Sequence, residues 1–98
     1  MIVKFSKSFQ KAAVKLSGSN RVALQKALIE AENAQNVESL TDCKPIQTVE
    51  GMYRKRIKDL RAFFSIHFTV EDNEIHFHYL VPRGQAYSKK IISNLRKL

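Results

Sequence analysis

The stretch from Gly51 to Tyr87 decides the fold and reads GMYRKRIKDLRAFFSIHFTVEDNEIHFHYLVPRGQAY. It divides into three segments with the composition of β-strands: Met52–Lys58, Leu60–Val70 and Glu74–Val81. An Asp72-Asn73 turn joins the last two segments, and a Pro82-Arg83-Gly84 turn follows them. We therefore predict three antiparallel strands that pair in chain order.

The middle segment alternates between two kinds of side chain. Its apolar set is Leu60, Ala62, Phe64, Ile66, Phe68 and Val70. Its second set is Arg61, Phe63, Ser65, His67 and Thr69. A period of two is typical of a strand with one face in a core and the other open to solvent. We expect the last segment to follow the same rule, with an inward set of Ile75, Phe77, Tyr79 and Val81.

Basic side chains gather on the face that this pattern leaves open. The last strand sends His76 and His78 outward, and the first sends Arg54, Arg56 and Lys58 to one side. If the three strands pair as a meander, these arginines and histidines share one surface. Such a surface predicts a polyanion as the partner.

The length and the charge of the chain narrow the class of partner. With 98 residues we expect one domain, residues 1–98, with 17 Lys and Arg against 9 Asp and Glu, a formal charge of +8. This balance favours nucleic acid, an anionic membrane or an acidic protein. Cys43 is the only cysteine, which excludes an internal disulfide and a cysteine-based metal site and fits a reducing, cytoplasmic location. No signal peptide and no apolar run of roughly 20 residues is present, so we expect no membrane association.

The N-terminal half combines a short strand with two helices. Ile2–Phe5 is a plausible extra strand, and the helix after it has Ser6 as its cap and Gly18 as its end. Its apolar face is Phe9, Ala12, Ala13 and Leu16. Asn20 is the expected N-cap of a second helix, whose buried stripe is Leu24, Ala27, Leu28 and Ala31. The short link between them predicts an antiparallel helical hairpin that covers the apolar face of the sheet.

The remaining segments complete an α+β domain. Residues 36–50, with Pro45, read as a loop that has room for one helical turn. Ser88–Leu98 reads as a short helix whose apolar side completes the core. The predicted order is β-α-α-β-β-β-α, with the N-terminal strand and the two-helix hairpin packed on one face of a small antiparallel sheet.

These residues carry a family resemblance. The run Tyr53-Arg54-Lys55-Arg56-Ile57-Lys58-Asp59-Leu60-Arg61, an apolar hairpin with an acidic turn, and Arg83 with Tyr87 four residues on resemble the RelE/ParE superfamily of bacterial toxins. The resemblance implies the toxin of a type II toxin–antitoxin pair, neutralised by an acidic, DNA-binding antitoxin protein. In the RelE branch the activity is cleavage of mRNA, commonly in the ribosomal A site, and no small-molecule cofactor is implied. In the ParE branch the target is DNA gyrase.

The resemblance also implies a catalytic set. Arg61 and Arg83 match the RelE-branch arginines that contact the scissile phosphate, and Tyr87 matches the C-terminal tyrosine of that site. Cleavage by the neighbouring 2′-OH passes through a phosphorane with added negative charge, which guanidinium groups stabilise without a metal ion. We expect the three side chains to converge on a concave wall opposite the helical pair.

The sequence departs from the family pattern at the proton-transfer positions. Arg54 and Arg56 fall where RelE itself has two lysines, and an arginine stays protonated and cannot act as a base. We hypothesise that His78 moves protons instead, because histidine titrates in the useful range. The residues expected to bind RNA are Arg54, Arg56, Lys58, His76, Lys89 and Lys90.

Simpler interpretations stay open at this point. The arginines of the first strand can simply be solvated, and Tyr87 can pack under the final helix. His76 and His78 could suggest a pair of metal ligands, but the sequence places no third ligand beside them. At the level of function, the alternatives are a ParE-like gyrase inhibitor and a non-catalytic basic RNA-binding domain. The joint presence of Arg61, Arg83 and Tyr87 favours the RNA-cleaving toxin.

Overall fold

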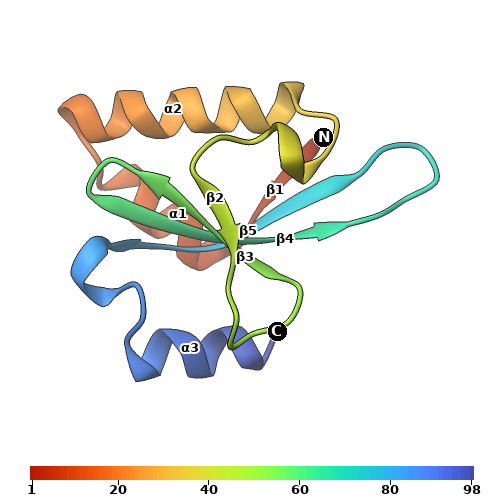
Figure 1. Cartoon of the computed structure of the whole chain (residues 1–98). Coiled ribbons are helices and arrows are strands. Elements are labelled where there is room, and N and C mark those ends of the chain that lie inside the picture. Colours follow the sequence, from red (N-terminus) through yellow and green to blue (C-terminus); the bar gives the residue numbers. More distant parts are fainter.

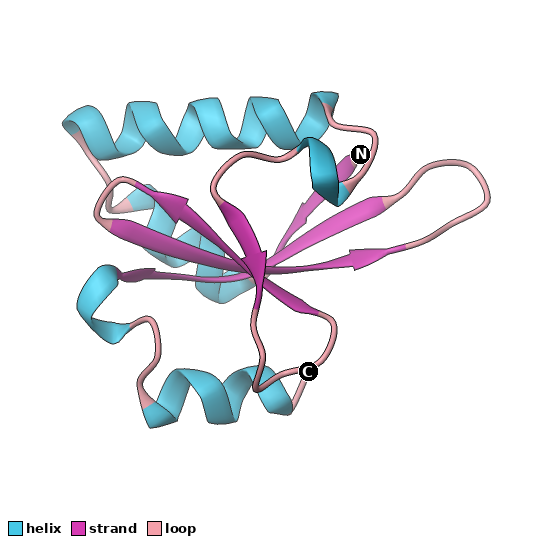
Figure 2. Ribbon diagram, viewed as in Figure 1, coloured by secondary structure: helices cyan, strands magenta, loops and turns pink.

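A five-stranded mixed sheet lies between helices on its two faces in the computed structural model, which describes residues 1–98 (Figures 1 and 2). The strands are β1 (Ile2–Phe5), β2 (Cys43–Pro45), β3 (Met52–Ile57), β4 (Leu60–His67) and β5 (Glu74–Pro82). The helices are α1 (Lys7–Val14), α2 (Gly18–Asn33) and α3 (Lys89–Arg96), with 3-10 turns at Val37–Ser39 and Arg83–Gln85. The strand order is β1-β5-β4-β3-β2, in which β1 runs parallel to β5 and the other pairs are antiparallel. The α+β class and the order of the main elements are as expected. Contrary to the prediction, the N-terminal strand does not pack on a face of an antiparallel sheet but extends the sheet by pairing in parallel with β5, which makes the sheet mixed.

The first core lies between the sheet and the hairpin of α1 and α2. Ala62, Phe64 and Ile75 are fully buried there, and the rings of Phe9, Phe64 and Phe77 pack on one another with centroids 5.2 to 5.6 Å apart. The alternating apolar set of β4 therefore faces the helices from Leu60 to Ile66, as predicted. Aliphatic and aromatic burial of this kind is the main driving force for folding.

Ser6 connects α1 to the sheet through one hydroxyl group. Its Oγ accepts a hydrogen bond from the Phe9 backbone N–H at 3.0 Å, which caps α1 as predicted. The same hydroxyl donates to the His78 carbonyl oxygen at 2.6 Å. The second helix begins earlier than expected, because Ser17 and not Asn20 is its N-cap residue.

The opposite face of the sheet is only partly open, which corrects the prediction of one continuous solvent-exposed surface. A second core forms there from Ile46, Val49, Met52, Phe63, Ala86, Ile91 and Leu95. Helix α3, below the sheet in Figure 1, brings the last two of these, and Ser88 Oγ caps it by accepting from the Ile91 N–H. Phe63 of β4 is fully buried because the apolar side of α3, with Ile91 and Leu95, packs over it.

A β-bulge changes which side chains of β5 face inward. Phe63 pairs with Tyr79 while Phe64 pairs with Phe77, so His78 is an extra residue with no partner on β4. An extra residue shifts the alternation by one position beyond it. As a result Leu80 enters the first core, whereas Tyr79 and Val81 pack against the second core. The prediction that Tyr79 and Val81 face the helical hairpin is wrong for this reason.

Several strand ends also differ from the expectation. β4 ends at His67, and the loop beyond it, which projects from the body in Figure 1, leaves Phe68 82% exposed and Val70 fully exposed. Lys58 has a positive φ of 54° and lies in the β3–β4 turn, not on the strand beside Arg56. Residues 36–50 contain the expected helical turn and, in addition, the short strand β2. None of the α-helices combines the length and apolar character that a membrane crossing needs.

A buried ion pair fastens α2 to the sheet. Lys55 points away from Arg54 and is nearly inaccessible, and its Nζ lies 3.0 Å from Glu30 Oε1 and 2.6 Å from the Thr41 carbonyl oxygen. Glu30 also accepts from the Thr41 N–H and hydroxyl. Burial raises the pKa of Glu30, but the hydrogen bonds from Thr41 and the charge of Lys55 outweigh it and leave the pKa below 4.5.

We expect Glu30→Gln to destabilise the protein at pH 7. Breaking a fully buried pair costs about 3 to 5 kcal/mol, and we expect about 2 kcal/mol because the Glu30 side chain keeps 29% exposure. Because the pKa of Glu30 is lowered on folding, its carboxylate stabilises the folded state fully above pH 4.5, and this stabilisation is lost as the pH falls through the lowered pKa. The difference in unfolding free energy between Glu30→Gln and the wild type should therefore be smaller in acid. Urea unfolding at pH 7 and pH 3.5 measures this. Glu32→Gln, on an exposed residue of the same helix, is the control, and an equal loss in both variants would contradict the assignment.

Candidate nucleic-acid interface

Arg61 is a buried guanidinium with no acidic partner. It lies near the start of β4, is 6% exposed, and its Nη1 donates to the carbonyl oxygens of Lys58 at 3.0 Å and Leu60 at 2.8 Å. No arginine takes part in any of the ion pairs of the structure. A buried charge held only by carbonyl groups is costly, and the cost falls when an anion binds to it.

Arg54 and Arg56 share the face of Arg61 because they alternate with Lys55, which points to α2. Arg56 is the direct cross-strand neighbour of Arg61, and Arg54 is the neighbour of Phe63. Arg56 is exposed, whereas the Nε of Arg54 is buried without a hydrogen-bond partner. Both side chains therefore add positive charge beside Arg61 with no counter-ion.

Arg83 and Tyr87 reach the same region from the segment between β5 and α3. The Arg83 N–H donates to the Asp59 carbonyl oxygen at 2.8 Å, which fixes the 3-10 turn against the β3–β4 turn. The Tyr87 ring meets Phe63 edge to face, with centroids 6.4 Å apart, and stays 58% exposed. Tyr87 is thus supported by the second core and still presents most of its ring to solvent.

These side chains act on one another electrostatically. Burial lowers the pKa of Arg61 first, and the neighbouring charges of Arg54, Arg56 and Arg83 lower it further. The structure therefore brings Arg61, Arg83 and Tyr87 together on the side of the sheet away from α1 and α2. We call Arg54, Arg56, Arg61, Arg83 and Tyr87 the arginine cluster. Lys58 lies in the adjoining turn, and Lys89 and Lys90 are exposed in the first turn of α3.

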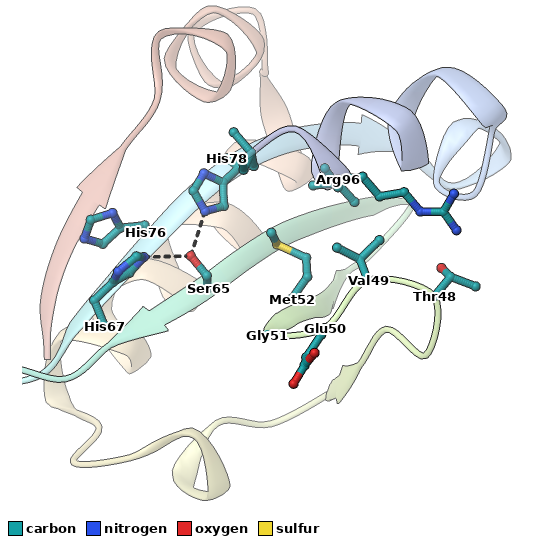
Figure 3. A pocket seen from close by; sticks show the side chains of 12 residues that line it. Thr48, Val49, Glu50, Gly51, Met52, Ser65, His67, His76, His78 and Arg96 are labelled. Carbon is teal, nitrogen blue, oxygen red and sulfur yellow. Dashed lines mark hydrogen bonds between the residues drawn. The ribbon is translucent and has the colours of Figure 1, made fainter.

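The structure does not bring His76 and His78 to the arginine cluster, which corrects the expectation of one shared surface. Arg61 pairs with Val81, which is three residues beyond His78 on β5, roughly 10 Å along the strand, and Arg83 follows in the 3-10 turn after the strand. The Nε2 of His78 lies 2.8 Å from Ser65 Oγ, and that hydroxyl also lies 2.9 Å from His67 Nε2 (Figure 3). Burial lowers the pKa of His78, and the nearby His76 and His67 lower it further. The ring of His78 thus contacts Ser65 and His76, and not the arginine cluster.

A pocket surrounds these histidines at the far end of the same face. It has a volume of about 560 Å³ and lies between the sheet, residues 48–52 and the C-terminal end of α3 (Figure 3). Sequence reasoning found its histidines but missed the pocket, because the pocket depends on where α3 and the 48–52 loop settle. The alternation of His76 and His78 with Phe77 was the only signal for it.

Solved structures of toxins share this fold. A chain of the RelB–RelE antitoxin–toxin complex from Methanococcus jannaschii matches with a TM-score of 0.67 and 21% identity, over 86% of this chain and 94% of that one. A mutant of Escherichia coli RelE in the free state matches with a TM-score of 0.67 and 16% identity, over 98% of this chain and 94% of that one. A YoeB/ParE toxin from Agrobacterium tumefaciens matches with a TM-score of 0.65 and 10% identity, over 84% of this chain and 98% of that one. No protein-family model and no curated protein matches the sequence. The expected RelE/ParE-like fold is confirmed.

Proposed function

Because this chain has the fold of the RelE and ParE-like toxins, we propose that it is the toxin of a type II toxin–antitoxin pair and cleaves mRNA. The cleavage needs no metal ion, takes place on the ribosome and stops translation. The observation that carries this proposal is Arg61, a guanidinium buried without a carboxylate and surrounded by three further arginines. A phosphodiester is an anion that suits such a cluster, because guanidinium groups bind phosphate oxygens through paired hydrogen bonds.

The arginine cluster suits a reaction in which negative charge develops at phosphorus. The 2′-oxygen of the ribose attacks the adjacent phosphorus, the bond from phosphorus to the 5′-oxygen breaks, and the 2′ proton ends on the departing 5′-oxygen. The phosphorane between these states carries more charge than the ground state. Arg61, held by its two carbonyl contacts, and Arg83, from the adjoining turn, would stabilise it by donating to its oxygens, and Tyr87 would stack on a base or orient the ribose.

The arginine cluster contains no side chain suited to transfer protons near neutral pH. Arginines do not give up protons near neutrality, Lys55 is committed to Glu30, and His78 lies in the separate histidine-lined pocket. The cluster is therefore built for charge stabilisation and positioning. We expect slow cleavage of free RNA and faster cleavage where the ribosome orients the 2′-OH for attack.

An antitoxin partner follows from the same surface. Four arginines without carboxylates leave an uncompensated positive patch, which an acidic segment of a partner protein would neutralise. By covering Arg61 and Tyr87, that segment would also exclude RNA. Inhibition and charge complementarity would thus depend on the same contacts.

We expect Arg83→Ala to lower the rate of mRNA cleavage by at least about 100-fold, because it removes a donor aimed at the developing charge. Arg83 is exposed, so the fold should be unaffected. Primer extension on cellular mRNA after induction measures cleavage, and growth measures toxicity. Arg21→Ala, an exposed arginine on α2, is the matched control. Undiminished toxicity without new mRNA ends, accompanied by gyrase-linked DNA breaks, would favour a ParE-like gyrase inhibitor instead.

A further inference from the structure

The pocket at the far end of the arginine-bearing face is lined on one side by imidazole rings. We call it the histidine pocket and define it by Ser65, His67, His76 and His78 on the sheet, Met52 on its floor and Arg96 at its rim. Its volume of about 560 Å³ lies within the range of small-molecule sites. Figure 3 shows the histidines on one side of the pocket and Arg96 on the other.

In the histidine wall, His67 and His76 pack against each other, so a ligand can meet only their outer faces and edges. The rings of His67 and His76 lie with centroids 3.9 Å apart and planes 31° apart, and His78 is 6.4 Å from His76. Ser65 Oγ bridges the Nε2 atoms of His67 and His78, and Glu74 holds the Nε2 of His76, so these contacts fix the rings and leave their Nδ1 atoms to meet a ligand. Flat aromatic surface combined with donors and acceptors suits an unstacked nucleobase.

The charges around the pocket place the anionic end of a ligand on the Arg96 side. Glu74 lies 2.9 Å from His76 Nε2 and 3.5 Å from Lys4 Nζ, so its charge is compensated. Glu50 lines the pocket from the 48–52 loop and disfavours an anion beside it, whereas Arg96 and the Thr48 hydroxyl favour one. No three His, Cys, Asp or Glu side chains are arranged to hold a metal ion. The donor set therefore favours an organic anion over a cation.

We propose that the histidine pocket binds one nucleotide of single-stranded RNA, with the base against His67 and His76 and the phosphate toward Arg96. The identification of RNA as the ligand rests on the proposed function. Arg61 and Ser65 are four residues apart on β4, roughly 13 Å, so a short strand held at the arginine cluster can reach the pocket. Base contacts in this pocket would give the protein a sequence preference that the arginine cluster, which contacts phosphate, does not supply.

Binding of mononucleotides tests the pocket independently of cleavage. AMP, GMP, CMP and UMP are titrated separately into the wild type while the imidazole Cε1–H signals are followed by NMR. We expect saturable shifts of His67 and His76 with at least one nucleotide. His67→Ala and Arg96→Ala, both at exposed positions, should weaken binding by about tenfold, because a stacked base and a phosphate contact are lost. Lys26→Ala, on the opposite side of the molecule, should bind like the wild type.

The outcomes separate this inference from the proposed function. Absence of saturable shifts, equal shifts with inorganic phosphate alone, or binding only in the presence of a divalent metal would each overturn it. Arg61→Met should lower cleavage by at least about 100-fold and leave mononucleotide binding unchanged. Binding without any cleavage by the wild type would remove the nuclease proposal alone. Cleavage without binding, or with an unchanged sequence preference in His67→Ala, would remove the nucleotide pocket alone.

Discussion

Arg61→Met is expected to lower RNA cleavage by at least about 100-fold while leaving the protein within about 1 kcal/mol of wild-type stability or above it. The catalytic loss follows because the guanidinium is the most deeply placed donor of the arginine cluster. The stability result follows because burial and three like charges penalise Arg61, and only two carbonyl hydrogen bonds offset that penalty. Methionine has a similar length and no charge to desolvate.

The measurements are single-turnover cleavage of mRNA on programmed ribosomes and unfolding in urea. Arg21→Met, an exposed arginine on α2, should change neither. A variant that cleaves at the wild-type rate would remove Arg61 from the reaction. A loss of more than 2 kcal/mol in stability would mean that its two carbonyl contacts hold the β3–β4 turn together and that any loss of cleavage is secondary.

Phe63→Ala is expected to cost about 4 kcal/mol of unfolding free energy, the largest effect of any single truncation on this face of the sheet. Phe63 is fully buried in the second core, where Ile91 and Leu95 of α3 pack, and it supports Tyr87 from the side. Its removal leaves a cavity under α3 and frees the tyrosine ring. The rate of RNA cleavage should therefore fall together with the free energy of unfolding. Relative to the wild type, amide exchange should accelerate more in α3 than in α2.

Urea unfolding and amide hydrogen exchange test this result, with Phe68→Ala as the control. Phe68 lies in the loop just after β4 and is 82% exposed, so its truncation should change the free energy of unfolding by no more than about 0.5 kcal/mol. Equal effects of the two substitutions would show that α3 is held by contacts other than Phe63. Faster exchange spread evenly over the molecule would mean that the second core does not open as a separate unit.

The inward face of β4 could be predicted from sequence because a strand alternates strictly when nothing interrupts it. From Leu60 to Ile66 the predicted and observed faces agree. The same rule failed in β5, since the bulge at His78 inserts one residue and leaves no mark in the composition. Tyr79 and Val81 are apolar enough for either face, so their side was decided by pairing with β4 and not by their own chemistry.

The candidate site divides in a similar way. The position of Arg61 between Arg56 and Val81 follows from the strand register, and its approach to Arg83 follows from the short β3–β4 turn. The separation of His78 from this group could not be predicted, because sequence distance along β5 does not reveal that α3 and Phe63 divide the face into two ends.

The hydroxyl of Ser6 links the N-terminal helix α1 to the bulge in strand β5. It accepts a hydrogen bond from the Phe9 N–H at the start of α1 and donates one to the carbonyl oxygen of His78, the bulge residue of β5. The start of α1 and the bulge of β5 are therefore joined through one side chain. The backbone of His78, one of the three histidines of the histidine pocket, is thus held by the sixth residue of the protein.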